Sequence, residues 1–286
     1  MYGILTNLEY EKHWIFKNYY FSLINVFGKD KIKRIFSIND LADIDVLFIG
    51  DEHFIPNKEI WMNNEFIKKC NDNKIKVIVF NNEKIFNSVF PWNEGIQKML
   101  NNFNDFKQFV YDCDDSDILN TEINKTYMSS YYKKILTFDY TQKKDKIVFF
   151  GKTKGSHSND MSYVNRANFI NEIKKHIEID IYESNDGVTM EEYLKTISGY
   201  KYVLSPMGNG NFVPMRYYES LFVQSIPLQQ STDNIIKKFN NEIIQKRGIF
   251  FKDTLELLEN INEYNVKPID YFMEDFINDT VLPIII

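Results

Sequence analysis

The sequence predicts an α/β protein made of two domains that face each other across a cleft. Short runs of β-branched and aromatic residues alternate with longer amphipathic segments along the whole chain, a pattern typical of buried parallel strands connected by helices. The polar segment Phe138–Lys146 (FDYTQKKDK) separates two halves that each hold their own strand and helix patterns. The length of 286 residues also fits two domains, since one domain usually takes about 150 residues.

In the first half, the apolar runs are bounded by turn-forming or charged residues, which is typical of strands buried on both faces of a sheet. The predicted strands are Tyr2–Leu5, Val46–Gly50 (VLFIG), Ile75–Phe80 (IKVIVF) and Phe106–Tyr111. The predicted helices span residues 11–27, 58–72, 92–104 and 122–135. These elements define an N-terminal α/β domain over residues 1–142.

The second half repeats the pattern over residues 143–286. The predicted strands are Ile147–Gly151 (IVFFG), Ile179–Tyr182, Tyr202–Ser205 (YVLS) and Ser225–Leu228. The predicted helices span residues 161–176, 190–198 and 214–224. The helical stretch from Leu255 onward has no strand partner, which allows the last helices to cross back to the first domain.

Composition and charge exclude several classes of protein. Hydrophobic residues make up 44% and charged residues 26%, as in ordinary globular domains. The net charge of -6 disfavours binding to nucleic acid, because such proteins usually carry a basic face. With two cysteines, Cys70 and Cys113, a disulfide scaffold is not expected. The absence of a long apolar window and of a signal-like N-terminus predicts a cytoplasmic protein, in a bacterial or virus-infected host cell, without stable membrane insertion.

The segment Lys201–Gln229 carries the clearest functional signal (KYVLSPMGNGNFVPMRYYESLFVQSIPLQ). A buried strand ends at Ser205, a loop with Gly208, Asn209 and Gly210 follows, and Pro214 is suited to the first turn of a helix. The free N–H groups and positive dipole of such a helix N-terminus favour an anion. The sequence therefore predicts an anion site at this loop.

Arg216 and Glu219 extend this signal on the predicted helix. Arg216 lies in the first turn and can contact phosphate oxygens with two donors, and Glu219 lies one turn later on the same face. A cation beside a diphosphate and a carboxylate for the ribose hydroxyls suit a nucleotide. The loop is neither a Walker A motif nor GxGxxG, which disfavours kinases, ATPases and dehydrogenases. The alternative is a bare turn with Arg216 and Glu219 as a surface pair.

The pattern YVLSPMGNG…R..ESL..QSIPL resembles the C-terminal signature of exostosin-like glycosyltransferases, a family of the GT-B class with two Rossmann-like domains. In that family a K-(Y/F)-x-L-(S/C)-P-x-G strand leads into a loop, followed by Arg, Glu and G-x-I-P. IVFFGKTKG and IDIYES resemble its two preceding strands. The resemblance covers Lys146–Gln230 and part of the tail. It departs at Met207, where Arg is common, and at Gln224-Ser225, where Leu-Gly is frequent.

The resemblance implies a site for a nucleoside-diphosphate sugar, UDP- or GDP-linked, in the C-terminal domain. Arg216 would bind the diphosphate and Glu219 the ribose, and the phosphate loop would be lined by Ser205, Gly208, Asn209 and Gly210. The first strand of this domain would present Gly151, Lys152 and Thr153 to the cleft. Lys152 is either a second phosphate ligand or a solvated loop lysine. Arg166 either reaches the diphosphate or caps its helix neighbours.

The implied reaction is glycosyl transfer to a hydroxyl of a glycan or glycoconjugate, with inversion. Arg216, Lys152 and the helix N-terminus would stabilise the leaving diphosphate, so neither a metal nor a cofactor is expected. The base would come from the first domain, where Asp51, Glu52 and His53 follow a buried strand directly. Asp51 is either the base or orients His53, and the alternative is a capping Asp and a packed His. The carboxylates in residues 112–117 (DCDDSD) suit a solvated loop better than a metal site.

Three other functions are compatible with the sequence. One is a viral-type glycosyltransferase that modifies DNA bases, which the acidic net charge disfavours. Another is a non-catalytic nucleotide-sugar-binding module that keeps the fold without the base. The third is an unrelated α/β binding protein of the periplasmic type, which the expected lack of a signal peptide disfavours. The oligomeric state cannot be deduced from these patterns.

Overall fold

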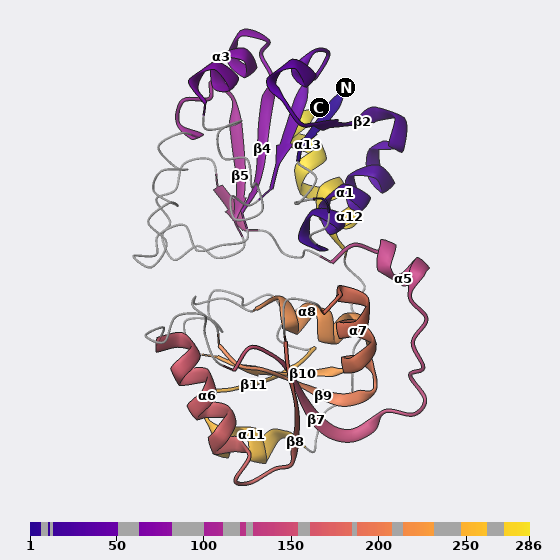
Figure 1. Ribbon diagram of the computed structural model, residues 1–286, viewed down its shortest axis with the longest axis vertical. Helices are drawn as coiled ribbons and strands as arrows, with labels where there is room; N and C mark the ends of the chain where they lie inside the picture. Colours follow the sequence, from indigo (N-terminus) through magenta and orange to yellow (C-terminus); the bar gives the residue numbers. More distant parts are fainter. Residues whose placement is uncertain are drawn as a thin grey trace. The chain divides into compact units, whose positions relative to one another are not determined.

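The computed structural model describes most of the chain, in two compact units (Figure 1). The described residues are 1–6, 11, 14–50, 63–81, 100–110, 121–123, 128–153, 161–184, 188–207, 214–231, 247–261 and 272–286. The first unit comprises residues 1–132 and 271–286, and the second comprises residues 133–270. Each unit has a parallel sheet of its own, so the predicted α/β class is confirmed.

Within the described residues, the first unit has a six-stranded sheet in the order β2-β1-β3-β4-β5-β6. Its strands are β1 (Tyr2–Leu5), β2 (Ile32–Ile35), β3 (Val46–Ile49), β4 (Lys76–Asn81), β5 (Phe106–Val110) and β6 (Thr121–Ile123). Its helical elements are α1 (Trp14–Phe27), η2 (Lys29–Lys31), η3 (Ile38–Leu41), α3 (Asn64–Asp72), α12 (Met273–Phe276), η6 (Ile277–Val281) and α13 (Leu282–Ile285). All neighbouring strands pair in parallel.

The two faces of the first sheet are filled by different kinds of side chain. On the α3 face, aliphatic residues such as Leu47, Val77 and Val79 pack with Phe66 and Cys70 of the helix. The opposite face is aromatic, and its contacts are Tyr19 of α1 with Phe80, Phe27 of α1 with Phe48, and Phe109 with Phe276 of α12. This alternation follows from the strand period of two residues, which sends successive side chains to opposite faces.

The last helices belong to the first unit through specific polar contacts as well as through Phe276. The Glu274 carboxylate accepts hydrogen bonds from the Ser129 hydroxyl at 2.7 Å, the Ser130 N–H at 3.0 Å and the Asn25 amide at 2.9 Å. Lys76 of β4 donates to the Ile284 carbonyl at 2.7 Å. The C-terminal segment is therefore fixed to both α1 and the sheet of this unit.

The described part of the second unit has a five-stranded sheet in the order β11-β10-β9-β7-β8. Its strands are β7 (Lys144–Gly151), β8 (Ile179–Glu183), β9 (Tyr200–Ser205), β10 (Ile226–Gln230) and β11 (Ile249–Phe251). Its helices are α5 (Tyr131–Ile135), which begins at the end of the first unit, α6 (Met161–Ile173), α7 (Met190–Ser198), α8 (Met215–Phe222) and α11 (Thr254–Asn260). The strands are all parallel to their neighbours.

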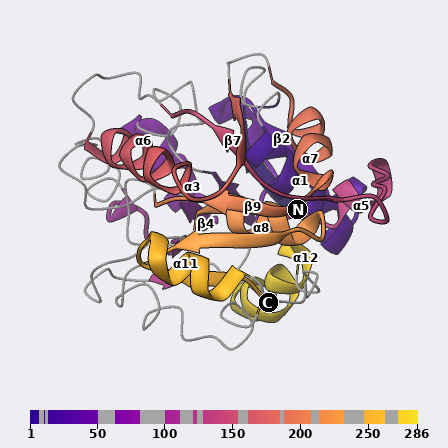
Figure 2. The same cartoon turned by 90° about the horizontal axis from the view of Figure 1, so that it is seen from below.

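Helices cover both faces of this second sheet (Figure 1). On one face, Leu204 and Leu228 join an apolar cluster with Ile170 of α6 and Leu257 of α11. Figure 2 views the second unit from this side. The other face carries α7 and α8, which pack against each other and against β9. The two faces are thus supplied by alternate residues of the same strands.

The structure corrects two predicted helices and adds short strands that the sequence patterns do not predict. Residues 121–123 form strand β6 instead of the start of a helix over 122–135, because Thr121 and Ile123 are β-branched and favour a strand, and the helix is limited to α5. The helix predicted over 92–104 does not continue after Leu100, since the Asn- and Asp-rich residues 101–105 form turns. The sequence patterns also missed the short strands β2 and β11.

Candidate functional site

The carboxyl edge of the second sheet brings together the described residues that the sequence singles out. Helix α8 connects β9 to its parallel neighbour β10 and packs on both strands. A helix in such a crossover runs back against the strands, so its N-terminus lies at their carboxyl ends. Pro214 is the N-cap, in an extended conformation, and α8 begins at Met215. Arg216 is therefore in the first turn, at the sheet edge where ligands bind in open α/β folds.

The Arg216 side chain reaches across to the carboxyl end of β7. Its Nε donates to the Phe150 carbonyl at 3.1 Å, and its Cζ lies 5.0 Å from the centre of the Phe149 ring. A Cβ atom on Gly151 would lie only 2.5 Å from Nη2 of Arg216. The glycine at the end of β7 therefore leaves the space that the guanidinium occupies, which is a physical reason for this residue type at position 151.

Glu219 lies one turn further along α8 and is buried, with 6% of its surface exposed. Its Oε2 accepts a hydrogen bond of 2.6 Å from the Tyr193 hydroxyl of α7. Burial raises the pKa of Tyr193 well above its ordinary value, and the neighbouring Glu219 carboxylate raises it further. A buried carboxylate with a tyrosine donor does not fit the alternative of an exposed Arg216–Glu219 surface pair.

The residues after β7 are held by contacts of their own. Nη1 of Arg166 on α6 donates to the Lys152 carbonyl at 3.1 Å. The Thr153 N–H donates to the Glu183 carboxylate at 3.1 Å, and the Thr153 hydroxyl contacts the same carboxylate. Arg166 thus anchors the Lys152–Thr153 segment to α6, a contact that differs from the capping of its helix neighbours considered from the sequence.

Three buried polar side chains lie at the carboxyl ends of β9 and β10. Ser205 is 0% exposed, Gln229 is 0% exposed and Ser231 is 3% exposed. Within the described part of the chain, Oγ of Ser205, Oε1 of Gln229 and Oγ of Ser231 have no hydrogen-bond partner. Buried polar atoms are paired in the large majority of cases, so this cluster calls for a physical explanation.

Several predicted site residues lie outside the described residues. These are Asp51, His53, Gly208, Asn209 and Gly210, together with the acidic stretch 112–117. The described residue that precedes Asp51 is Gly50, which is buried directly after β3. The predicted catalytic base and the glycine loop therefore stay predictions from the sequence.

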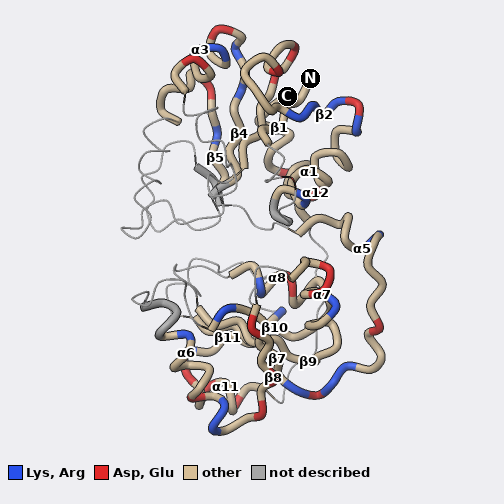
Figure 3. The backbone as a smooth tube through the Cα atoms, in the orientation of Figure 1, with Lys and Arg blue, Asp and Glu red and all other residues tan. Residues whose placement is uncertain are grey.

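Charge and metal-ligand patterns add little within the described residues. Acidic and basic residues are interspersed along both units (Figure 3). No group of three or more His, Cys, Asp or Glu side chains in the described ranges is placed to hold a metal ion. In the same ranges, no helix is both long and apolar enough to cross a membrane.

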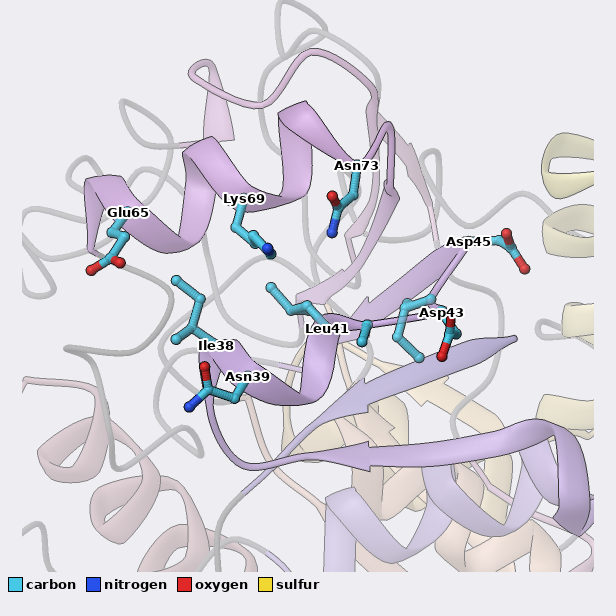
Figure 4. Close-up of a pocket in the computed structure, with 10 residues that line it drawn as sticks. Ile38, Asn39, Leu41, Asp43, Asp45, Glu65, Lys69 and Asn73 are labelled. Carbon is cyan, nitrogen blue, oxygen red and sulfur yellow. The ribbon is translucent and has the colours of Figure 1, made fainter.

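A separate pocket of about 610 Å³ lies in the first unit, between η3 and α3 (Figure 4). Glu65 and Lys69 of α3 and its C-cap Asn73 line one side, and Ile38 and Leu41 of η3 line the other. The pocket is beside Asp45, at the amino-terminal end of β3. Open α/β sheets bind their ligands beyond the opposite ends of the strands, so this pocket is not the candidate site.

Sequence reasoning missed three residues of the site, namely Tyr193, Gln229 and Ser231. The sequence predicts a helix over residues 190–198, which includes Tyr193, but the contact of Tyr193 with Glu219 joins two helices and depends on tertiary packing. A signal for Gln229 was present, because a glutamine that directly follows the apolar run Ile226–Leu228 interrupts a buried strand. The unusual residue type at a buried position could have marked it.

Comparison of the chain with models of known protein families gives no match, and comparison with curated protein sequences gives none either.

Proposed function

We propose that this protein is a glycosyltransferase of the GT-B type, which transfers a sugar from a nucleoside-diphosphate sugar to a hydroxyl group of a carbohydrate acceptor. The observation that carries the proposal is the position of Arg216. Its guanidinium lies at the carboxyl edge of the second sheet, beside Gly151 and in the first turn of α8. This arrangement combines a helix N-terminus with a two-pronged cation, which suits a diphosphate.

Glu219 supports the nucleotide part of the proposal. Its carboxylate is buried one turn from Arg216 and is oriented by Tyr193. A fixed carboxylate beside a phosphate site is suited to accept hydrogen bonds from ribose hydroxyls. The first unit would then hold the acceptor and supply the base, with Asp51 and His53 as candidates. The proposed reaction is metal-independent, inverts the anomeric centre and takes place in the cytoplasm.

In the proposed mechanism, a base removes the proton of the acceptor hydroxyl while its oxygen attacks the anomeric carbon. The bond from that carbon to the diphosphate oxygen breaks, and the nucleoside diphosphate leaves with the bonding electrons. Negative charge grows on the diphosphate as this bond breaks. Arg216, Lys152 and the α8 N-terminus would stabilise that charge.

The test is nucleotide binding followed by turnover. UDP, GDP and their sugar conjugates are titrated while the melting temperature is recorded, with wild type and Arg216→Ala compared. Arg34→Ala is the matched control, because Arg34 is in the first unit and pairs with Glu11. We expect one nucleotide series to raise the wild-type and Arg34→Ala melting temperatures and to leave Arg216→Ala unchanged.

Three outcomes would redirect the proposal. If no nucleotide or nucleotide sugar raises the melting temperature, the glycosyltransferase assignment is wrong. If nucleotide sugars bind but neither hydrolysis nor transfer to glycan acceptors releases nucleotide, the chain is a non-catalytic binding module. A band shift with duplex DNA would instead favour transfer to DNA bases.

A further inference from the structure

The buried oxygens of Ser205, Gln229 and Ser231 lie side by side on one face of the second sheet. Ser205 and Gln229 are direct partners in the register of β9 and β10, so their side chains point to the same face. Ser231 follows Gln229 by two residues, and its N–H continues the sheet by donating to the Phe251 carbonyl at 2.9 Å. We call these three side chains the polar patch.

The polar patch lies on the same face as α8 rather than on the face of α6 and α11. Leu204 and Leu228, which alternate with Ser205 and Gln229, belong to the apolar cluster formed with α6 and α11. The opposite face is covered by α7 and α8. The N-terminus of α8 and the polar patch therefore lie together at the carboxyl ends of β9 and β10. They are two independent observations that point to the same site.

The chemistry of the polar patch differs from that of Arg216. Nε2 of Gln229 donates to the Gln230 carbonyl, so Oε1 is left as an acceptor. A phosphate oxygen has no proton to donate to this atom, whereas a hydroxyl group does. None of the three side chains carries a charge, so the patch offers nothing to neutralise a carboxylate. Its ligand is thus expected to be uncharged and to bear hydroxyl groups.

The spacing requires more than one hydroxyl group. Neighbouring parallel strands are about 4.8 Å apart, and residues two positions apart on a strand are separated by about 7 Å. A single donor cannot satisfy three oxygens spread over such distances at hydrogen-bond lengths near 2.8 Å. A sugar ring carries several hydroxyl groups at fixed positions, and it can satisfy them together.

On the basis of the proposed function, we infer that Ser205, Gln229 and Ser231 form the subsite for the hydroxyl groups of the transferred sugar, and that this sugar is neutral. Ser205, which the sequence places in the phosphate loop, then contacts the sugar. The diphosphate occupies the neighbouring position at Arg216. The two parts of the donor are recognised by separate groups of residues.

The experiment compares two affinities in each variant, one for the free nucleoside diphosphate and one for its sugar conjugate. The probes are UDP with UDP-glucose, UDP-galactose and UDP-glucuronate, and GDP with GDP-mannose, measured by calorimetry. We expect Gln229→Leu, Ser205→Ala and Ser231→Ala to weaken binding of the preferred neutral nucleotide sugar about tenfold, the equivalent of ~1.4 kcal/mol. Their affinity for the free nucleotide should change less than about twofold.

Ser225→Ala is the matched control, because Ser225 is also fully buried in this unit but its hydroxyl is hydrogen-bonded to the Tyr200 carbonyl at 2.7 Å. It should leave both affinities unchanged. If the polar-patch variants weaken nucleotide and nucleotide sugar equally, or weaken neither, the subsite is refuted while the proposed function stands. Preference for UDP-glucuronate would refute the neutral sugar. If wild type binds no nucleotide at all, the proposed function itself fails, and the subsite with it.

Discussion

Two buried serines of the second unit show how the two ends of one sheet differ. Ser225 lies just before β10, at the amino edge, and Ser205 ends β9, at the carboxyl edge; both are 0% exposed. The Ser225 hydroxyl contacts the carbonyls of Tyr200 at 2.7 Å and Ile197 at 3.2 Å and the Lys143 ammonium at 2.9 Å. Among the described residues, the Ser205 hydroxyl has no partner.

This difference separates residues that serve the fold from residues that serve a ligand. A paired buried hydroxyl contributes to stability, whereas an unpaired one has lost its hydrogen bonds to water without gaining others, so it stabilises nothing and carries a desolvation cost. The amino edge follows the first pattern, and the carboxyl edge follows the second. Natural proteins keep such locally unfavourable groups mainly at functional sites. Four substitutions test this contrast through the free energy of unfolding, and one of them also through nucleotide affinity.

The largest effect is expected for Lys143→Met at the amino edge. The Lys143 ammonium donates to the Ser198 carbonyl at 2.8 Å and the Val223 carbonyl at 2.9 Å, at the C-terminal ends of α7 and α8, as well as to Ser225. Removing it leaves these acceptors without their cation. We expect the free energy of unfolding to fall by about 3 kcal/mol, measured by urea denaturation. Lys144→Met is the control, since among the described residues Lys144 Nζ contacts only the hydroxyl and ring of Tyr200.

The next effect is expected for Ser225→Ala. The substitution removes a hydroxyl that contacts two carbonyls and Lys143, so the loss should be about 1–2 kcal/mol. In a double-mutant cycle with Lys143→Met, the two losses should not add, because the residues share a hydrogen bond. Additive losses would mean that the amino edge is not a connected network.

Tyr193→Phe is expected to lower the free energy of unfolding less than Ser225→Ala and more than Ser205→Ala. It removes the 2.6 Å hydrogen bond to the buried Glu219 carboxylate but keeps the aromatic ring, which lies 5.1 Å from the Phe150 ring in an edge-on arrangement. We expect a loss of about 1 kcal/mol in unfolding free energy. If Tyr193 orients Glu219 for a nucleotide, nucleotide affinity should also fall, whereas Tyr200→Phe, which changes a tyrosine bonded to Asp180, should leave it intact.

Features of the fold that depend on neighbouring residues in the sequence can be predicted from it, whereas features that depend on contacts between distant residues cannot. The strands β3, β4, β7 and β9 were predictable because uninterrupted apolar runs mark burial on both faces. Strand β2 was not, because its residues Ile32–Ile35 include two basic side chains and it lies at the edge of its sheet. Edge strands expose one side and tolerate charge, so they lack the apolar signal.

The residues of the candidate site likewise fall into two groups, those that the sequence predicts and those that only tertiary packing reveals. The positions of Arg216 and Glu219 on a helix were predictable, because the apolar strand, the two glycines and Pro214 follow one another along a continuous stretch of sequence, and α8 begins directly after Pro214. The role of Gly151 was not visible, since the space it leaves is filled by Arg216, 65 positions later in the chain. The absence of partners around Ser205, Gln229 and Ser231 is likewise a property of tertiary packing, which periodicity and composition do not encode.

The smallest change in unfolding free energy is expected for Ser205→Ala. This substitution is the direct test of the difference between the amino and carboxyl edges of the sheet. The substitution removes a buried hydroxyl that forms no hydrogen bond with the described residues, so the free energy of unfolding should change by less than about 0.5 kcal/mol, or rise slightly. The urea midpoint of this variant is compared directly with that of Ser225→Ala, which changes the same residue type at the same burial. If both variants lose stability equally, the Ser205 hydroxyl is paired in solution, and the carboxyl edge is stabilised in the same way as the amino edge. A stable Ser205→Ala variant instead means that folding does not require this hydroxyl, which leaves ligand binding as its physical explanation.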